Sequence, residues 1–293
     1  MEKLKSSLDR SVNFVLDNGQ EARYVRREDD YFIVYLSSHN GCNKACRFCH
    51  LTQTGQTDFA ESTMDDFIAQ AALVLNHYSS QVSLGLEKPA KQINFNWMAR
   101  GEPLDNATVT SNWGGLVGNL TKLCEPLGIE KVNFNVSSII PASYTQEFVF
   151  SGDVQPHIYY SLYSLSESFR KRWLPKACAP SDAVSRLVDW QVRTNGSVTL
   201  HWAMIEGEND DEETMRDVIQ LVESSGLRAK FNLVRYNPFS EAQGAEPLEY
   251  VLNERFQQIL PVMKNDGSRI VPRVGFDVKA SCGMFVEIAS SKK

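Results

Sequence analysis

Three of the six cysteines in this chain lie close together near the N-terminal end. Cys42, Cys46 and Cys49 occur in the segment GCNKACRFCH, residues 41–50, and His50 follows the last of them directly. Thiols grouped in this way bind a metal, form a disulfide or act as a redox pair. The first question is therefore which of these chemistries the C-x3-C-x2-C spacing serves.

Four interpretations compete for this segment. A tetrahedral zinc ion normally takes two ligand pairs from separate segments, and adjacent Cys49 and His50 give poor geometry for one ion. Residues 46–50 also match the C-x-x-C-H haem-attachment pattern, which normally requires export. A thiol–disulfide oxidoreductase would use only two of the three thiols. The fourth interpretation, which the spacing favours, is an iron–sulfur cluster held by three thiolates, with one iron left open to a ligand.

The elements that must position these thiols alternate along the chain. The expected strands are 30–38, 92–99, 131–138, 157–164, 197–205, 228–236 and 269–278, and the expected helices are 63–78, 112–128, 181–193, 211–226 and 249–266. Strands that alternate with helices of this length indicate a mostly parallel sheet. About six such units are too few for a closed eightfold barrel. The sequence therefore predicts an open, partial (β/α)6 barrel over residues 31–293.

A β-hairpin is expected before the barrel, within residues 1–30. Two runs of alternating polarity flank Asp17-Asn18-Gly19, and Asn-Gly supplies the positive φ that a tight turn needs. The cysteine segment follows the first barrel strand, and ligands of α/β folds bind at the carboxyl ends of strands. The other candidate site loops are 99–106, 136–141, 162–172, 205–210 and 236–244.

Composition limits the class of protein. The chain has 293 residues, of which 42% are hydrophobic and 23% charged, and no apolar run approaches the length of about 18 residues that spans a bilayer. The N-terminus has no apolar signal region, so we expect a cytoplasmic protein that uses neither a membrane nor structural disulfides. The net charge of −6 argues weakly against a surface that binds nucleic acid throughout, but residues 23–27 and 170–176 could form local basic patches.

The cysteine spacing resembles that of the radical-SAM superfamily. The resemblance implies a 4Fe-4S cluster on Cys42, Cys46 and Cys49, whose open iron binds the amine and carboxylate of S-adenosyl-L-methionine. One electron then cleaves the cofactor and yields a 5′-deoxyadenosyl radical. The electron would come from a partner such as flavodoxin or ferredoxin. His50 is then expected to be a loop residue.

Residues from about 12 to 286 are similar, in order, to the radical-SAM methyltransferases that act on adenine C-2 or C-8 in ribosomal and transfer RNA. The matching residues are Glu21–Tyr24, Ser37-Ser38, Gly101–Leu104, Asn106, Ser161-Leu162, Arg170, Pro175, Asn237–Phe239 and Ala280–Gly283. The resemblance assigns cofactor binding to four residues: Gly101, Glu102, Ser161 and Asn237. It also implies that Cys282 carries the methyl group as methylcysteine and that Glu21 accepts a proton. We therefore expect a monomeric enzyme that methylates an adenine in RNA.

The residues alone leave other readings of these positions open. Asn237 could be a turn residue before Pro238, Cys282 a small buried hydrophobic residue, and Glu21 an exposed charge of the hairpin. The whole chain could likewise be a radical-SAM enzyme that modifies a DNA base, a nucleotide or a protein, or a non-catalytic iron–sulfur protein.

The chain departs from the family pattern at several positions. Tyr35 stands where the family has a second cysteine, which forms a disulfide with the methyl-carrying cysteine and releases the product. Cys178 lies in a predicted loop and is therefore the better candidate to replace that second cysteine. Cys124 lies on an apolar helix and is expected in the core. Tyr163 stands where the family has histidine, and Ala99-Arg100 where it has Met-Gly. The family's N-terminal RNA-binding accessory domain has no counterpart in this sequence.

Overall fold

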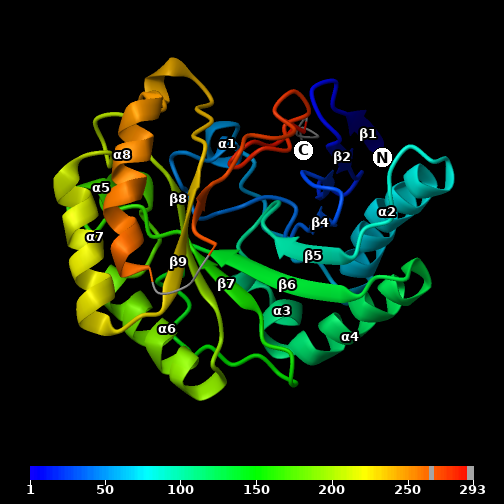
Figure 1. The fold of residues 1–293 in the computed structure, drawn as a ribbon, viewed down its shortest axis with the longest axis horizontal. Coiled ribbons are helices and arrows are strands. Elements are labelled where there is room, and N and C mark those ends of the chain that lie inside the picture. Colours follow the sequence, from blue (N-terminus) through cyan, green and yellow to red (C-terminus); the bar gives the residue numbers. More distant parts are fainter. Residues whose placement is uncertain (264–266, 289–293) are drawn as a thin grey trace.

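A computed structural model describes residues 1–263 and 267–288, and its strands form one ten-stranded sheet in chain order (Figure 1). The strands are β1 (Glu2–Lys5), β2 (Val12–Val15), β3 (Glu21–Val25), β4 (Tyr31–Tyr35), β5 (Gln92–Trp97), β6 (Lys131–Ser138), β7 (His157–Tyr160), β8 (Val198–Ala203), β9 (Ala229–Val234) and β10 (Arg269–Ile270). The helices are α1 (His50–Gln53), α2 (Met64–Ser83), α3 (Ala107–Ser111), α4 (Trp113–Cys124), α5 (Glu167–Trp173), α6 (Pro180–Thr194), α7 (Glu212–Ser225) and α8 (Glu249–Ile259).

Strands β4 to β10 pair in parallel, and β1 to β4 pair antiparallel. The sheet curves with helices on its outer face and does not close, which confirms the predicted partial barrel (Figure 1). The expected hairpin is β2 and β3. A further strand, β1, was not predicted because its sequence EKLK is charged and lacks a clear alternating pattern. The division of the chain at residue 30 remains a prediction, since β3 continues the barrel sheet through β4.

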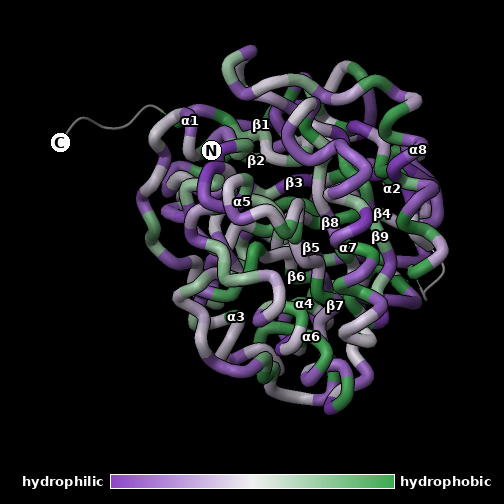
Figure 2. The backbone as a smooth tube through the Cα atoms, turned by 90° about the vertical axis from the view of Figure 1, so that its left-hand side faces the viewer, coloured by the Kyte–Doolittle hydropathy of each residue, from purple (hydrophilic) through white to green (hydrophobic). Residues whose placement is uncertain are grey.

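The two faces of the sheet have different chemistry. On β4, Phe32 and Val34 are buried on the outer face, whereas Tyr31 and Tyr35 line cavities inside the barrel. The alternation of hydrophobic and hydrophilic residues along the central strands is visible in Figure 2. Helix α2 begins with a capping box between Thr63 and Asp66, which satisfies free backbone N–H groups at its start. The polar inner face therefore belongs to the site, and the apolar outer face to the core.

Two expected elements differ at their ends. The expected strand 269–278 is only β10, because Pro272 cannot donate a backbone hydrogen bond to a ladder. The expected helix 249–266 ends as α8 at Ile259, followed by a 3-10 turn that contains Pro261, and residues 264–266 lie outside the described residues. Helix α5 forms inside an expected loop, where the Ser166 side chain accepts a hydrogen bond from the Phe169 N–H. None of the helices described here has both the length and the apolarity to cross a membrane.

Candidate active site

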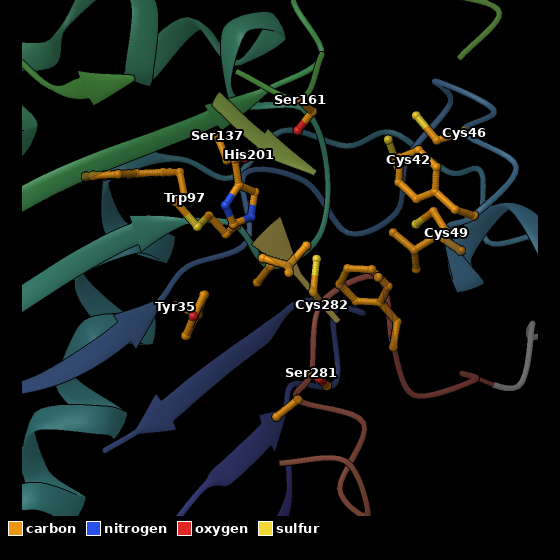
Figure 3. A pocket seen from close by; sticks show the side chains of 18 of the residues that line it. Tyr35, Cys42, Cys46, Cys49, Trp97, Ser137, Ser161, His201, Ser281 and Cys282 are labelled. Atoms are coloured by element: carbon orange, nitrogen blue, oxygen red, sulfur yellow. The ribbon is translucent and has the colours of Figure 1, made fainter. Parts of the chain in front are cut away.

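A cavity of about 180 Å³ opens at the carboxyl ends of the parallel strands. Seven of the nine predicted site residues line it: Cys42, Cys46, Cys49, Gly101, Glu102, Ser161 and Cys282. Figure 3 shows the three clustered cysteines to one side, with Cys282 projecting from the C-terminal loop. The fold thus brings together residues that are separated by up to 240 positions in the chain (282 − 42).

The cysteine loop leaves β4 and folds back tightly on itself. The Cys42 N–H donates to the Gln56 carbonyl at 3.1 Å, and the Cys49 N–H donates to the Cys46 carbonyl at 3.1 Å. A Cβ atom at Gly41 would lie 2.4 Å from the Asp58 carbonyl oxygen, so only glycine fits this close approach. These backbone contacts turn the three thiols toward the same cavity.

The three thiols provide a donor set that fits an iron–sulfur cluster. Burial raises the pKa of Cys42 to about 12, with the nearby charge of Cys49 adding to the effect. The pKa of Cys46 is raised well above its usual value, first by burial and then by Cys42 and Cys49. Thiolates that are buried together in this way require cationic metal to compensate their charge.

The arrangement favours a cluster over a single ion. No group of three or more His, Cys, Asp or Glu side chains within residues 1–263 and 267–288 is placed to hold one metal ion. Tetrahedral zinc with Zn–S bonds of about 2.3 Å would need sulfur atoms only about 3.8 Å apart. A cluster brings its own sulfides, so its protein ligands stand farther apart.

The loop after β5 shapes the cavity wall beside the cysteines. Gly101 has a φ of +96°, and a Cβ atom there would lie 2.5 Å from both His39 Nδ1 and Ser38 Oγ. The buried Glu102 carboxylate accepts hydrogen bonds from the N–H groups of Leu104 at 3.1 Å and Ile139 at 3.3 Å. Burial raises the pKa of Glu102 to about 7. A cationic ligand in the cavity would therefore favour the ionised form of the Glu102 carboxyl group.

Two aromatic rings connect the cysteine loop to β7. Phe48 stacks on Tyr163 with ring centroids 4.4 Å apart and an interplanar angle of 15°. Tyr163 has a φ of +63°, an uncommon backbone conformation for a bulky residue. Nearby, the Ser161 N–H donates to the Ser138 carbonyl at 2.9 Å, which leaves the Ser161 side chain in the cavity wall. The stack fixes the cysteine loop against the segment after β7, which carries the predicted cofactor residue Ser161.

Cys282 is exposed and lines the cavity. Burial raises the pKa of the Cys282 thiol to about 11, and Cys49 adds to the increase while Arg23 and Arg27 oppose it. The reading of Cys282 as a buried hydrophobic residue does not fit, since its side chain is exposed in the cavity. The thiol is thus placed for reaction and is protonated at neutral pH in the absence of a ligand.

Asn237 lies behind Cys282 and does not line the cavity. Its Nδ2 donates to the Cys282 carbonyl at 2.9 Å and to Ser281 Oγ at 3.2 Å, while its Oδ1 accepts from Arg273 Nε at 2.8 Å. The His50 Nε2–H donates to the Asn237 carbonyl at 3.1 Å. Both ends of the amide are therefore occupied by the protein. The structure places Asn237 as a support for the Cys282 loop, and the cofactor contact stays a prediction.

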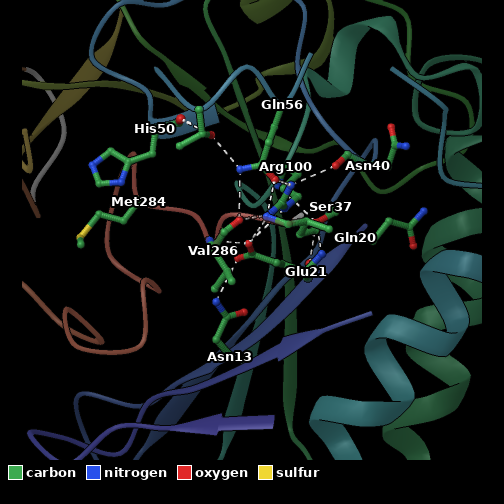
Figure 4. A network of polar contacts seen from close by, with 12 residues as sticks. Asn13, Gln20, Glu21, Ser37, Asn40, His50, Gln56, Arg100, Met284 and Val286 are labelled. Carbon is green, nitrogen blue, oxygen red and sulfur yellow. Dashed lines mark hydrogen bonds and ion pairs between the residues drawn. The ribbon is translucent and has the colours of Figure 1, made fainter. Parts of the chain in front are cut away.

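Glu21 also lies outside the cavity wall, at the centre of a buried polar network (Figure 4). Its carboxylate lies 2.7 Å from Arg23 Nη2 and 2.8 Å from Arg100 Nη2, and all three side chains are at most 2% exposed. Burial alone would raise the pKa of Glu21, but the two arginine charges lower it below its usual value. Glu21 is therefore an ionised partner of two guanidinium groups and not an exposed hairpin charge; its predicted role as a proton acceptor remains untested.

The same network holds the C-terminal segment. Arg23 donates to the Met284 carbonyl at 2.6 Å, and Arg100 donates to the Val286 carbonyl at 2.5 Å. The Val286 N–H in turn donates to Glu21 Oε1 at 2.9 Å. The ion pairs thus anchor the chain a few residues after Cys282, on the opposite side of that residue from Asn237.

The positions that depart from the family pattern lie in different places. Tyr35 lines the cavity, whereas Cys178 does not, and the Cys178 N–H donates to the Ile140 carbonyl at 2.9 Å. Cys124 is 2% exposed and its thiol contacts the Leu120 carbonyl, which confirms the expected core position. His50 is the first residue of α1 and not the expected loop residue, since the Thr54 N–H donates to its carbonyl at 2.9 Å. Its side chain does not line the cavity, and the expectation that it is no ligand stays a prediction.

The sequence interpretation did not assign several polar side chains to the cavity wall. Arg23 and Arg27 belong to an expected basic patch, whereas Lys44, His201, Arg235 and Arg273 were not singled out; all six line the cavity. One signal was available for His201, which stands between the apolar residues Leu200 and Trp202 on β8 and must face the inside of the barrel. Four of these cations form ion pairs with carboxylates: Arg23 with Glu21, Lys44 with Asp105, and Arg235 and Arg273 with Glu246. Burial lowers the pKa of His201 to about 4, so Arg27 is the one cation of this set without an ion pair among the described residues.

Comparisons with known proteins identify relatives over most of the chain. No family model matches the chain. The dual-specificity RNA methyltransferase RlmN of Wolinella succinogenes is 25% identical over 274 residues, which cover 92% of this chain and 70% of that protein. RlmN of Nitratidesulfovibrio vulgaris is 30% identical over 258 residues, which cover 85% of this chain and 64% of that protein. The chain therefore spans about two thirds of the length of these relatives.

A solved structure has a similar fold. A radical SAM methyltransferase from Sphaerobacter thermophilus superposes with a TM-score of 0.73 at 18% identity, covering 97% of this chain and 80% of that chain. These findings confirm the resemblance that the cysteine spacing and the later loops indicated. The chain is a homologue, over nearly its whole length, of the proteins named dual-specificity RNA methyltransferase RlmN, and it has the fold of a radical SAM methyltransferase.

Proposed function

We propose that this protein is a radical-SAM methyltransferase that methylates an adenine in RNA, with Cys282 as the carrier of the methyl group. The observation that supports the proposal most is the placement of Cys282 in the same cavity as Cys42, Cys46 and Cys49. The relatives named RlmN support RNA as the substrate.

The residues present fit a 4Fe-4S cluster on the three clustered cysteines and S-adenosyl-L-methionine beside it. When bound, the reduced cluster supplies the electron that cleaves the cofactor. Gly101 leaves room for a close backbone approach, and Glu102 would accept a hydrogen bond from the cofactor's ammonium group. Ser161 offers a neutral hydrogen bond. A one-electron donor such as flavodoxin or ferredoxin completes the system.

The chain's own residues control protons around Cys282. Methyl transfer to its sulfur needs the thiolate, and the raised pKa means that the thiol must first lose a proton. Arg23 and Arg27 favour the thiolate because both of their charges lower the pKa of Cys282. Tyr35, one of two tyrosines that line the same cavity, has a phenol that can exchange a proton with a substrate there.

Tyr35 also supports a second candidate function. A phenol cannot form the disulfide through which the family releases its product, and Cys178 lies outside the cavity wall. The alternative is a radical-SAM enzyme that shares the cluster and the cofactor but modifies another substrate, such as a DNA base, a nucleotide or a protein side chain.

The experiment that separates these functions uses anaerobically reconstituted protein with a reductant, S-adenosyl-L-methionine and RNA. The expected result is 5′-deoxyadenosine together with a methylated adenine, detected by mass spectrometry of nuclease digests. Cys282→Ala should still form 5′-deoxyadenosine but no methylated adenine. Cys178→Ala should form both products. Methylation by Cys282→Ala at the wild-type rate would rule out the methyl relay. Formation of 5′-deoxyadenosine without RNA methylation in the wild type would favour the alternative function.

A further inference from the structure

A second cavity, of about 510 Å³, lies at the opposite end of the parallel strands from the cysteine loop. Its wall includes the first residues of three neighbouring strands, since Tyr31, Gln92 and Lys131 are aligned in register on β4, β5 and β6. Polar residues dominate the rest of the wall. A barrel interior is normally filled by apolar side chains, so an open polar space here needs an explanation.

The charges in this wall are all of one sign. Lys131, Lys230 and Arg269 line the cavity together with His157, and none of the described residues in the lining is an aspartate or glutamate. None of the three cations forms an ion pair with a carboxylate of the residues that the structure describes. Because the whole chain carries a net charge of −6, this concentration of positive charge is local.

The cations also lie close enough to affect one another. Burial lowers the pKa of Lys230, and the charge of Arg269 lowers it further. Burial also lowers the pKa of His157 to about 3, with Lys230 adding to the effect, so His157 is neutral at physiological pH. A bound anion would relieve the repulsion between Lys230 and Arg269.

Neutral donors complete the wall. Asn94 Oδ1 accepts hydrogen bonds from Asn133 Nδ2 at 2.8 Å and from Gln92 Nε2 at 2.9 Å. With its carbonyl occupied in this way, Asn94 presents its NH2 group as the donor for a ligand. Cations together with an amide donor are the groups that bind oxyanions in proteins.

Side chains of the two cavity walls contact one another. Tyr159 lines the second cavity and His201 the first, and their rings contact edge to face with centroids 5.4 Å apart. Burial raises the pKa of Tyr159 to about 12 and lowers the pKa of His201 to about 4, and the charge of Arg269 lowers the pKa of both groups. A ligand in the second cavity would therefore lie directly beneath the floor of the candidate active site.

We propose that the second cavity binds a small phosphate-bearing anion, either orthophosphate or a phosphate monoester. Phosphate carries close to two negative charges at neutral pH, which matches the two nearby cations Lys230 and Arg269. The guanidinium of Arg269 provides paired donors for a tetrahedral oxyanion. The volume falls in the range of small-ligand sites, about 300 to 1,000 Å³. This proposal is independent of the proposed methyl transfer.

The test is isothermal titration of the reconstituted full chain with orthophosphate, adenosine 5′-monophosphate and adenosine, at constant ionic strength. Lys230→Gln and Arg269→Gln should each weaken phosphate binding at least about tenfold, the effect of losing one charge-assisted hydrogen bond. Lys230→Arg keeps the charge and should restore most of the affinity. The control Lys122→Gln/Arg216→Gln removes two exposed cations elsewhere and should bind phosphate as the wild type does.

The three ligands identify the source of the phosphate. Tighter Lys230-dependent binding of the nucleotide than of orthophosphate assigns the site to a phosphate monoester, and equal binding assigns it to phosphate alone. Adenosine has no phosphate, so any heat that it produces should be the same for Lys230→Gln and the wild type. Failure of the wild type to bind orthophosphate, or equal binding by Lys230→Gln, would overturn the proposal.

Discussion

Arg100 Nη2 lies 2.8 Å from Glu21 Oε1, and at most 1% of either side chain is exposed. Glu21 begins β3 in the antiparallel part of the sheet, whereas Arg100 directly precedes the Gly101 loop of the cavity. The pair therefore connects the N-terminal strands with the predicted cofactor loop. Since Arg100 also donates to the Val286 carbonyl, it connects both with the segment that carries Cys282.

Arg100→Met should destabilise the protein strongly. The substitution leaves the buried Glu21 carboxylate without one of its two cations and leaves the Val286 carbonyl without a donor. Breaking a buried pair in this way costs about 3 to 5 kcal/mol. Urea unfolding of the cluster-free protein measures the loss, and the exposed Arg216→Met is the control, with an expected change within about 0.5 kcal/mol. A loss for Arg100→Met no larger than that of the control would contradict the stabilising role.

The Glu21 network should also give the protein an acid-sensitive stability. The folded-state pKa of Glu21 lies below its ordinary value of 4.5, so its contribution is present above pH 4.5 and is lost as the pH falls through the lowered pKa. Glu21→Gln removes this titration and should have a flatter dependence of unfolding free energy on pH below about 5, despite lower stability at pH 7. Urea midpoints at a series of pH values measure both slopes. Parallel curves for the two proteins would show that Glu21 does not contribute to the acid sensitivity.

Gly101→Ala should disrupt the cavity wall. The added Cβ would lie 2.5 Å from His39 Nδ1, and the φ of +96° is also unfavourable for alanine. Gly85→Ala is a matched control, because Gly85 also has a positive φ, +68°, but a Cβ there meets nothing within 4 Å. We expect Gly85→Ala to cost about 1 kcal/mol and Gly101→Ala clearly more, together with weaker binding of S-adenosyl-L-methionine. Equal losses of stability would mean that the close approach at Gly101 is not tight.

Cys46→Ser should remove the iron–sulfur cluster. The wild type purified without oxygen should contain about four iron atoms per chain and absorb broadly in the visible range. Cys46→Ser should lose most of the iron and most of the visible absorbance. Cys124→Ser keeps all three predicted ligands and should retain the iron and the absorbance of the wild type. Iron and sulfide analysis with visible spectroscopy provides the measurement. Wild-type protein that contained zinc in place of iron would contradict the cluster assignment.

The sequence predicted the parts of the site that depend on local patterns. The C-x3-C-x2-C spacing and the alternation of strands and helices placed Cys42, Cys46 and Cys49 at the carboxyl edge of the sheet, where the structure has them. The end of β10 was missed although Pro272 signalled it, because the apolar residues around the proline still read as a strand.

The environment of Glu21 could not be predicted in the same way. Its partners Arg100 and Val286 lie 79 and 265 positions away, and no local pattern reports a pairing over such distances. The second cavity was missed for a related reason. Lys131, Lys230 and Arg269 lie at or near the starts of three different strands, and only the curvature of the sheet brings them together.

Two backbone tethers restrict how the reactive sulfur can travel. The carbonyl of Cys282 is held by Asn237, and the carbonyl of Gly283 accepts from the His50 N–H at 2.9 Å. Both tethers hold the main chain at Cys282 and directly after it, so rotation about χ1 moves the sulfur through a short arc. A methyl donor and an acceptor that this sulfur serves must therefore both come within reach of that arc.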